Sequence, residues 1–343
     1  MSIQTRLLNK TDTANTETVK LHRFNRLDAQ RYPYLLASSA DRENNTQFDI
    51  LPAFPQFQLT LNADRSIHCS DPAFTPGNGF LDSLEKLYQR DKIEPLANSS
   101  NGDNDTMLPF TGGWFVYLSY EIAEEIEPCL SLPELPSGQP LAIASRCPAA
   151  IIFDKRKRQF IAVAETGHAD LLDVMEQDFQ RLLSDLDDSD NAQLTAADAI
   201  ALETLTEEDT EPYLQQVASI KQYIIDGDIF QANLSRLWQG RLRDAVADDV
   251  LFERLSSQNP SSFAAMACLG DITIISSSPE RLVSLREGIV ETRPIAGTRA
   301  RGDGKIDDEL AQELMNHPKE QAEHIMLIDL ERNDLGRVCV PGS

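Results

Sequence analysis

Two glutamates three residues apart, Glu320 and Glu323, have the spacing in this chain that most directly suggests chemistry. They lie in the run 319–334, whose composition is typical of a helix. Side chains three residues apart share one face of a helix, so both carboxylates should point the same way. Two convergent carboxylates suit a hard divalent cation such as Mg²⁺, which takes oxygen ligands and keeps several waters. The pair equally fits a solvated acidic face near a helix start, where negative charge complements the helix dipole.

Glu280, Gly297 and Thr298 are further candidates, upstream of that run. Glu280 follows a proline at the end of a predicted strand over 271–276, a position that often faces a crevice in sheet enzymes. Gly297 permits close approach of the backbone to a ligand, and Thr298 with its neighbouring amides can hold a carboxylate through hydrogen bonds. The same turn is also compatible with an ordinary loop.

Gln231 belongs to an alternation of polar and apolar residues that follows Gly227. As a strand, the run 228–238 places Gln231 and two further polar side chains on one face. That face is either the solvated side of an edge strand or the polar floor of a site. Just upstream, Thr210 is the expected N-cap of a helix that Gly227 ends.

Composition and charge exclude several classes of protein. The 343 residues contain 31 Lys and Arg against 55 Asp and Glu, a formal charge of -24 that disfavours nucleic acids and anionic membranes as partners. The five cysteines form no CxxC pair, so neither a zinc site nor a disulfide framework is expected. With no signal segment and no apolar run near the roughly 20 residues that span a bilayer, the sequence predicts a cytoplasmic protein.

Three regions differ in composition. Residues 1–164 carry short apolar runs broken by Pro, Gly and Asn, which is typical of strands, and one helical run over 80–90. Residues 165–211 are strongly acidic and combine one amphipathic helix with a predicted solvated linker. Residues 212–343 form the third region and contain all the candidate residues named above.

Four ordered motifs resemble those of the chorismate-utilising enzymes. They are GDIFQANLS at 227–235, SSPER at 277–281, RPIAGTR at 293–299 and KEQAEHIMLIDLERNDLGRV at 319–338. That family includes anthranilate synthase component I, aminodeoxychorismate synthase component I, isochorismate synthase and salicylate synthase. The resemblance implies an α+β fold like that of anthranilate synthase component I, in which large antiparallel sheets pack with outer helices. It also makes the third region an incomplete chorismate-binding region.

The resemblance implies roles for the candidate residues. Mg²⁺ held by acidic side chains would bind a carboxylate of chorismate and stabilise the charge that develops as a ring hydroxyl leaves. Glu323 matches a metal ligand, and Glu320 matches a nearby or water-mediated one. Glu280 matches an acid-base glutamate that acts on the leaving oxygen. Gly297 and Thr298 match the loop that holds a substrate carboxylate.

Gln231 and Ala296 bear on which reaction the chain performs. Gln231 stands where the water-adding members carry a lysine base, so it favours ammonia, which is already a competent nucleophile. Ala296 stands where aminodeoxychorismate synthases carry a lysine that attacks C2 of the ring, and it matches the anthranilate synthases instead. The amino-terminal segments YPYLLASS, TQFDILPAFP and FTGGWFVYLSYE resemble the aminodeoxychorismate branch.

Three functions remain open from the sequence. The first is amination of chorismate to 4-amino-4-deoxychorismate, on the route to p-aminobenzoate and folate. The second is conversion of chorismate to anthranilate and pyruvate. The third is a non-catalytic binding subunit, because the chain ends at Ser343, before the later motifs of the family. If that end is natural, weak or no activity is expected.

The resemblance also implies partners. Both ammonia-using branches pair with a glutamine amidotransferase subunit, which is therefore the expected protein partner, with chorismate as the expected substrate. A tryptophan pocket is implied as well, with tryptophan as an inhibitor or a structural ligand. The matching positions are Ser38, Asn45, Thr46, Gln47, Phe48, Ser262, Phe263 and Ala264.

Overall fold

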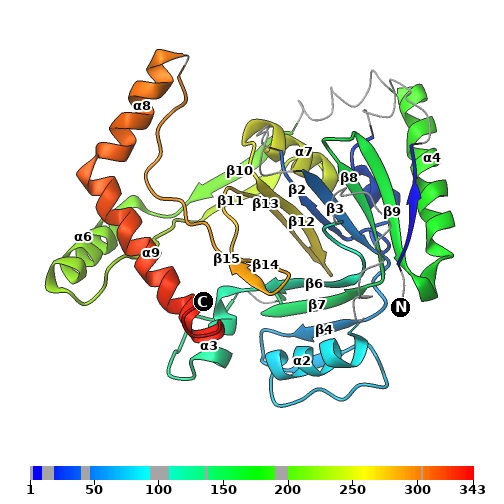
Figure 1. The fold of residues 1–343 in the computed structure, drawn as a ribbon, viewed down its shortest axis with the longest axis horizontal. Helices are drawn as coiled ribbons and strands as arrows, with labels where there is room; N and C mark the ends of the chain where they lie inside the picture. Colours follow the sequence, from blue (N-terminus) through cyan, green and yellow to red (C-terminus); the bar gives the residue numbers. More distant parts are fainter. Residues whose placement is uncertain are drawn as a thin grey trace.

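The chain forms two antiparallel sheets with helices packed outside them, and two separate hairpins (Figure 1). A computed structural model describes residues 3–9, 19–39, 47–92, 108–135, 138–189, 200–302 and 304–343. Within those residues, every strand pairing is antiparallel. The predicted α+β class is confirmed.

The larger sheet has seven strands in the order β1-β9-β8-β3-β2-β12-β13. Strands β12 and β13 follow the others by about a hundred residues, yet β12 pairs with β2, with Ala264 opposite Ala37 and Met266 opposite Leu35. The strand bounds are β1 Ile3–Leu7, β2 Tyr34–Ala37, β3 Phe48–Ala53, β8 Ala149–Asp154, β9 Gln159–Glu165, β12 Phe263–Leu269 and β13 Ile272–Ser278.

The smaller sheet has four strands in the order β5-β4-β7-β6. Two hairpins do not pair with either sheet. One is formed by β10 and β11 and the other by β14 and β15. The bounds are β4 Gln58–Leu61, β5 Ile67–Cys69, β6 Gly113–Leu118, β7 Ala142–Cys147, β10 Leu202–Glu207, β11 Trp238–Leu242, β14 Ser284–Arg286 and β15 Ile289–Glu291.

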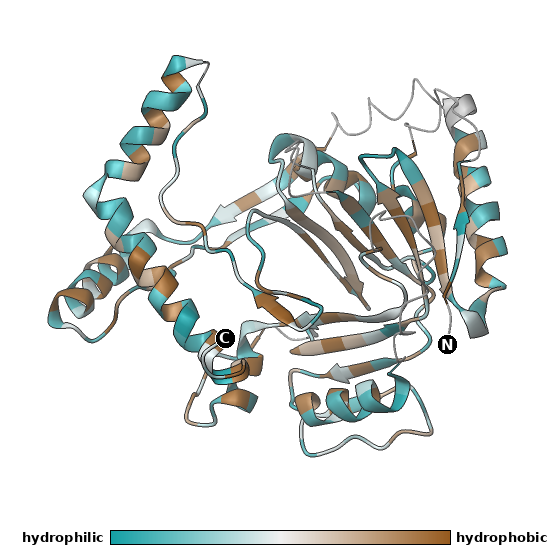
Figure 2. Cartoon of the chain, in the orientation of Figure 1, coloured by the Kyte–Doolittle hydropathy of each residue, from teal (hydrophilic) through white to brown (hydrophobic). Residues whose placement is uncertain are grey.

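Helices bury the outer face of each sheet. Helix α4 packs on the larger sheet through Met175 and Phe179, and α2 packs on the smaller one through Phe80 and Leu87, all fully buried. Figure 2 shows the matching apolar colouring along the strands. The helix bounds are α1 Arg23–Leu27, α2 Phe80–Asp91, α3 Ala123–Ile126, α4 Leu171–Ser189, α6 Thr210–Asp226, α7 Asp248–Gln258, α8 Lys305–Asn316 and α9 Pro318–Val338, with short 3₁₀ turns at Tyr120–Ile122 and Thr166–His168.

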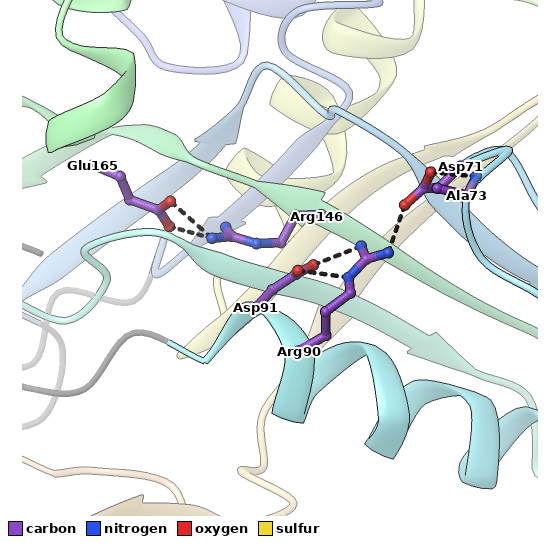
Figure 3. Close-up of polar contacts among 6 residues, drawn as sticks. All are labelled: Asp71, Ala73, Arg90, Asp91, Arg146 and Glu165. Carbon is purple, nitrogen blue, oxygen red and sulfur yellow. Dashed lines mark hydrogen bonds and ion pairs between the residues drawn. The ribbon is translucent and has the colours of Figure 1, made fainter.

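A buried ion pair joins the two sheets (Figure 3). Arg146 of β7 donates from Nη2 to both carboxylate oxygens of Glu165 in β9, at 2.7 and 2.8 Å. The side chains are only 6% and 7% exposed. Gly112, at φ +107°, lies against this pair, because a Cβ there would come within 2.2 Å of Glu165 Oε1. The double glycine at the start of β6 therefore allows a backbone conformation and a close approach that other residues would disturb.

Two local predictions after residue 200 are wrong. The N-cap of α6 is Asp209, whose carboxylate accepts from Glu211 N–H at 3.2 Å, rather than Thr210, although Gly227 does end the helix in the left-handed region. The run 228–237 is not a strand, since β11 begins only at Trp238, where pairing with β10 starts. Alternation alone does not make a strand when no neighbouring strand completes its hydrogen bonds.

The acidic region 165–211 contains a packed helix and a strand. Its helix α4 is part of the core of the larger sheet, and its described part also supplies β10. Strands from the first and third predicted regions share the larger sheet. The division at 165–211 stays a prediction. Helix α8 extends away from the sheets, and the C-terminal end of α9 lies beside α3 (Figure 1), where Arg337 is 3.4 Å from Glu127. No helix in the described part of the chain is long and apolar enough to cross a bilayer.

Candidate functional site

Helix α9 carries both glutamates that suggested a metal, and it packs closely against the loop containing Gly297. A Cβ at Gly297 would lie 1.9 Å from Glu320 Oε2, so only glycine allows this approach without displacing the carboxylate. The Glu320 side chain is 12% exposed. Glu323 lies nearly one turn further along α9 and is half-buried. The predicted close approach at Gly297 is thus present, and what it meets here is a side chain of α9.

Arg299 holds the same loop to both carboxyl-terminal helices. Its Nη1 lies 3.5 Å from Glu320 Oε1, and its Nε donates to Glu313 Oε1 of α8 at 3.1 Å. Sequence reasoning did not single out Arg299, although it is the last residue of the motif RPIAGTR. The guanidinium offers a fixed set of donors that can orient a carboxylate.

Glu280 contacts the same loop at Ile295. The backbone N–H of Ile295 donates to Glu280 Oε1 at 3.4 Å, and the glutamate is otherwise exposed. Thr298 donates its hydroxyl to the carbonyl of Ala296 at 3.3 Å. The loop 295–299 therefore contacts both predicted acidic groups, Glu280 and Glu320.

Gln231 is not joined to this group. It is exposed in the segment after α6, and within the described residues no hydrogen bond links its side chain to the loop 295–299. The strand that should have oriented it is absent. Its predicted role in choosing the nucleophile has no geometric support here and stays a prediction.

The donor set fits Mg²⁺ only in part. Glu320 and Glu323 supply hard oxygen atoms, and one or two carboxylates with water and substrate are a usual Mg²⁺ environment. No group of three or more His, Cys, Asp or Glu able to hold a metal is present in the part of the chain that the structure describes. Glu320 also has a cationic neighbour in Arg299. A bound Mg²⁺ would therefore depend on water and substrate for most of its ligands.

A separate pocket of about 570 Å³ lies between the larger sheet and the β14–β15 hairpin. Six of the eight residues predicted to form a tryptophan pocket line it, whereas Asn45 and Thr46 lie outside the described residues. The structure thus brings these positions together, and tryptophan as the ligand stays a prediction. The six are Ser38, Gln47, Phe48, Ser262, Phe263 and Ala264.

Hydrogen bonds hold one wall of the pocket. Ser39 N–H donates to the carbonyl of Ser261 at 2.8 Å, and Ser261 N–H donates back to Ser39 Oγ at 2.9 Å. Ser38 N–H donates to Asp49 Oδ1 at 2.8 Å, and Lys155 Nζ lies 2.8 Å from the same oxygen. Burial raises the pKa of Asp49, and the ammonium of Lys155 opposes that shift.

Four arginines line the same pocket and were missed by sequence reasoning. Arg281 and Arg293 belong to the motifs SSPER and RPIAGTR, so attention to every cation in those motifs would have found them. Arg156 and Arg286 lie in turns and strands without any motif, and only the fold brings them to the pocket.

Comparison with known proteins places the chain in a family. A sequence model described as chorismate binding enzyme matches residues 38–343. Anthranilate synthase component 1 of Synechocystis sp. is 34% identical over 92% of this chain and 65% of its own length. Aminodeoxychorismate synthase component 1 of Bacillus subtilis is 37% identical over 70% of this chain and 51% of its own length.

A solved structure has the same fold. The crystal structure of anthranilate synthase component I from Streptococcus pneumoniae superposes with a TM-score of 0.62 at 25% identity, covering 87% of this chain and 63% of that one. The chain thus spans about half to two thirds of the length of these proteins. Because the family model matches most of the sequence, this protein belongs to the family of chorismate binding enzymes.

Proposed function

We propose that this chain aminates chorismate with ammonia in an Mg²⁺-dependent reaction. The observation that carries the proposal is that the loop 295–299 contacts both Glu280, through the Ile295 amide, and Glu320 of α9, at Gly297. Membership of the family supports chorismate as the substrate. Backbone amides and a threonine hydroxyl in such a loop suit one carboxylate of a dicarboxylate ligand.

Glu280 is the proposed proton donor. It would protonate the ring hydroxyl, which then leaves as water, while ammonia forms the new carbon–nitrogen bond. A bound Mg²⁺ would supply positive charge that stabilises a substrate carboxylate and the charge developing on the ring. Glu320 and Glu323 would hold that ion, and Arg299 would orient Glu320. The loop around Gly297 would position the substrate carboxylate.

Two products are compatible with this chemistry. The first candidate is 4-amino-4-deoxychorismate, which keeps the enolpyruvyl ether, and the amino-terminal segments favour it. The second is anthranilate with loss of pyruvate, and Ala296 favours it together with the several relatives named anthranilate synthase component 1. In either case a glutamine amidotransferase subunit is the proposed source of ammonia.

Product identification tests the proposal. The chain is incubated with chorismate, Mg²⁺ and an ammonium salt, and products are identified by mass spectrometry alongside an assay for pyruvate. An aminated product that keeps the enolpyruvyl group supports the first candidate, whereas anthranilate with equimolar pyruvate replaces it by the second. Chorismate that binds but is never converted would overturn both and favour a non-catalytic binding subunit.

A further inference from the structure

We propose that Glu331 of α9 is a positioning residue for the loop 295–299, which it holds in place through Thr292. The role in substrate binding rests on the proposed function, because that loop is the proposed site of a substrate carboxylate. The attachment itself does not depend on the reaction. Three features lead to the proposal, namely a contact at each end of the segment, the lengths of segment and helix, and the face of α9 involved.

The first contact is at the start of the segment. Thr292 directly follows β15, and its hydroxyl donates to Glu331 Oε2. Both residues are half-buried. A hydrogen bond from a hydroxyl to a carboxylate is charge-assisted and stronger than one between neutral groups. The chain is therefore attached to α9 as soon as it leaves the β14–β15 hairpin.

The second contact attaches the segment to the same helix further along. A Cβ at Gly297 would lie 1.9 Å from Glu320 Oε2, and Arg299 Nη1 lies 3.5 Å from Glu320 Oε1. Residues 292–302 form neither helix nor strand, so no ladder of backbone hydrogen bonds determines their path. Figure 1 shows this segment passing beside α9 on its way to α8. Its position thus depends on the side-chain contacts at its two ends.

The distances along the helix and along the segment match. Glu320 and Glu331 are eleven residues apart, which is about 16.5 Å along a helix. Thr292 and Gly297 are five residues apart, and five residues of extended chain also span about 16.5 Å. Pro294 favours an extended backbone for itself and for the residue before it. The segment is therefore held nearly extended and antiparallel to α9, and it cannot slide without breaking a contact.

The contacts lie on the face of α9 that carries the proposed metal ligands. Glu320, Glu323, Leu327 and Glu331 follow one another at intervals of three or four residues, and all four are half-buried. A displaced segment would move the loop 295–299 relative to this face without removing any proposed ligand. Glu331 would in this way affect substrate binding while touching neither substrate nor metal.

Substitutions at Thr292 test the role by calorimetric titration of chorismate in the presence of Mg²⁺. Thr292→Val removes the hydroxyl and keeps the size of the side chain, so chorismate should bind about tenfold more weakly than to the parent. That factor corresponds to about 1.4 kcal/mol, close to the contribution of one hydrogen bond to a charged group. Thr292→Ser keeps the hydroxyl and should restore binding to within about twofold of the parent.

Substitution of the acceptor completes a double-mutant cycle. Glu331→Leu should weaken binding as much as Thr292→Val does, and the variant with both changes should bind no more weakly than either alone, because both remove the same hydrogen bond. Thr206→Val, on the exposed strand β10, is the matched control and should bind as the parent does. Parent-like binding by Thr292→Val, or losses that add in the double variant, would overturn the proposal.

Limited digestion with trypsin measures the attachment without chorismate. Cleavage requires a locally loosened chain, so the bond after Arg299 should be cut at least about fivefold faster in Thr292→Val and Glu331→Leu than in the parent or Thr292→Ser. Equal cleavage rates would overturn the attachment even if the parent binds chorismate. A parent that does not bind chorismate would instead overturn the proposed function, and the cleavage rates would still decide whether Glu331 positions the loop.

Discussion

The contact of Glu280 with the loop 295–299 supports its proposed role as proton donor. Its carboxylate lies 3.4 Å from the Ile295 amide, at the edge of the loop proposed to hold substrate. Glu280→Gln removes the transferable proton while keeping size and most hydrogen bonding. Steady-state kinetics should therefore show turnover falling by about 100-fold or more, with a much smaller change in KM.

Glu309→Gln, on the exposed face of α8, is the matched control for this substitution and should behave as the parent does. A Glu280→Gln variant that loses substrate affinity but keeps its turnover would remove Glu280 from the acid-base role. It would leave the residue with a part in binding alone.

Substitution of Glu323 tests the proposed Mg²⁺ site most directly. Glu323→Gln replaces an anionic oxygen by a weaker neutral ligand, so the Mg²⁺ concentration for half-maximal activity should rise by about tenfold or more. Asp329→Asn on the same helix, where the carboxylate pairs only with nearby Arg332 among the described residues, should not change it. Normal activity of Glu323→Gln at low Mg²⁺ would refute the assignment.

Sequence reasoning works best for residues whose role is local. The freedom of Gly297 to allow close approach is a property of glycine itself, and the structure shows that approach against Glu320. Arg156 and Arg286 illustrate the opposite case. They come from segments about 130 residues apart, and nothing in either segment indicates that the fold would bring both to one pocket.

At the scale of elements, the sequence pattern located several of the longer helices, although it predicted neither α1 nor α7. The run 319–334 lies within α9 and the run 80–90 within α2, because each has its own internal hydrogen bonds. The run 228–237 failed as a strand because a strand needs a partner, and only Trp238 onward finds one in β10. The alternation of residues in one segment does not show whether another strand will pair with it.

The ion pair of Arg146 and Glu165 should be the strongest single link between the two sheets. Glu165→Gln leaves the guanidinium buried without its counter-charge, so the free energy of unfolding should fall by about 3–5 kcal/mol in urea titrations. Arg332→Gln, which breaks a pair that is 72% and 70% exposed, should change it by less than about 0.5 kcal/mol. Equal losses of unfolding free energy in the two variants would show that the buried pair stabilises the fold no more than the exposed pair does.

Asp71 should contribute to the acid sensitivity of the smaller sheet. The Ala73 N–H, which donates to its carboxylate, and then Arg90, lower the pKa of Asp71 (Figure 3). A carboxyl whose pKa is lower in the folded state contributes stability above its unfolded pKa and loses it as pH falls through the folded value. Asp71→Asn should thus lower the urea midpoint near neutral pH and have less effect at about pH 3. A difference that is the same at both pH values would contradict this role.

At the scale of the whole molecule, the resemblance predicted the architecture and local patterns did not. The pairing of β12 with β2 joins segments more than 200 residues apart, and it connects the β12–β13 pair to the rest of the larger sheet and forms one wall of the pocket. Such pairing depends on burial of both faces against distant elements. The amphipathic helix predicted within the acidic region is present as α4, and Met175 and Phe179 bury it in the core in spite of the charge around them.

Calorimetric titration of chorismate in the presence of Mg²⁺ tests most directly whether the loop 295–299 and α9 form the substrate site. The parent chain should bind chorismate. Gly297→Ala should weaken binding by at least about tenfold, since its Cβ would come within 1.9 Å of Glu320 Oε2. Gly336→Ala in α9, where a Cβ meets nothing within 4 Å, should bind as the parent does. Chorismate that fails to bind the parent, or binds both variants equally, would contradict the account.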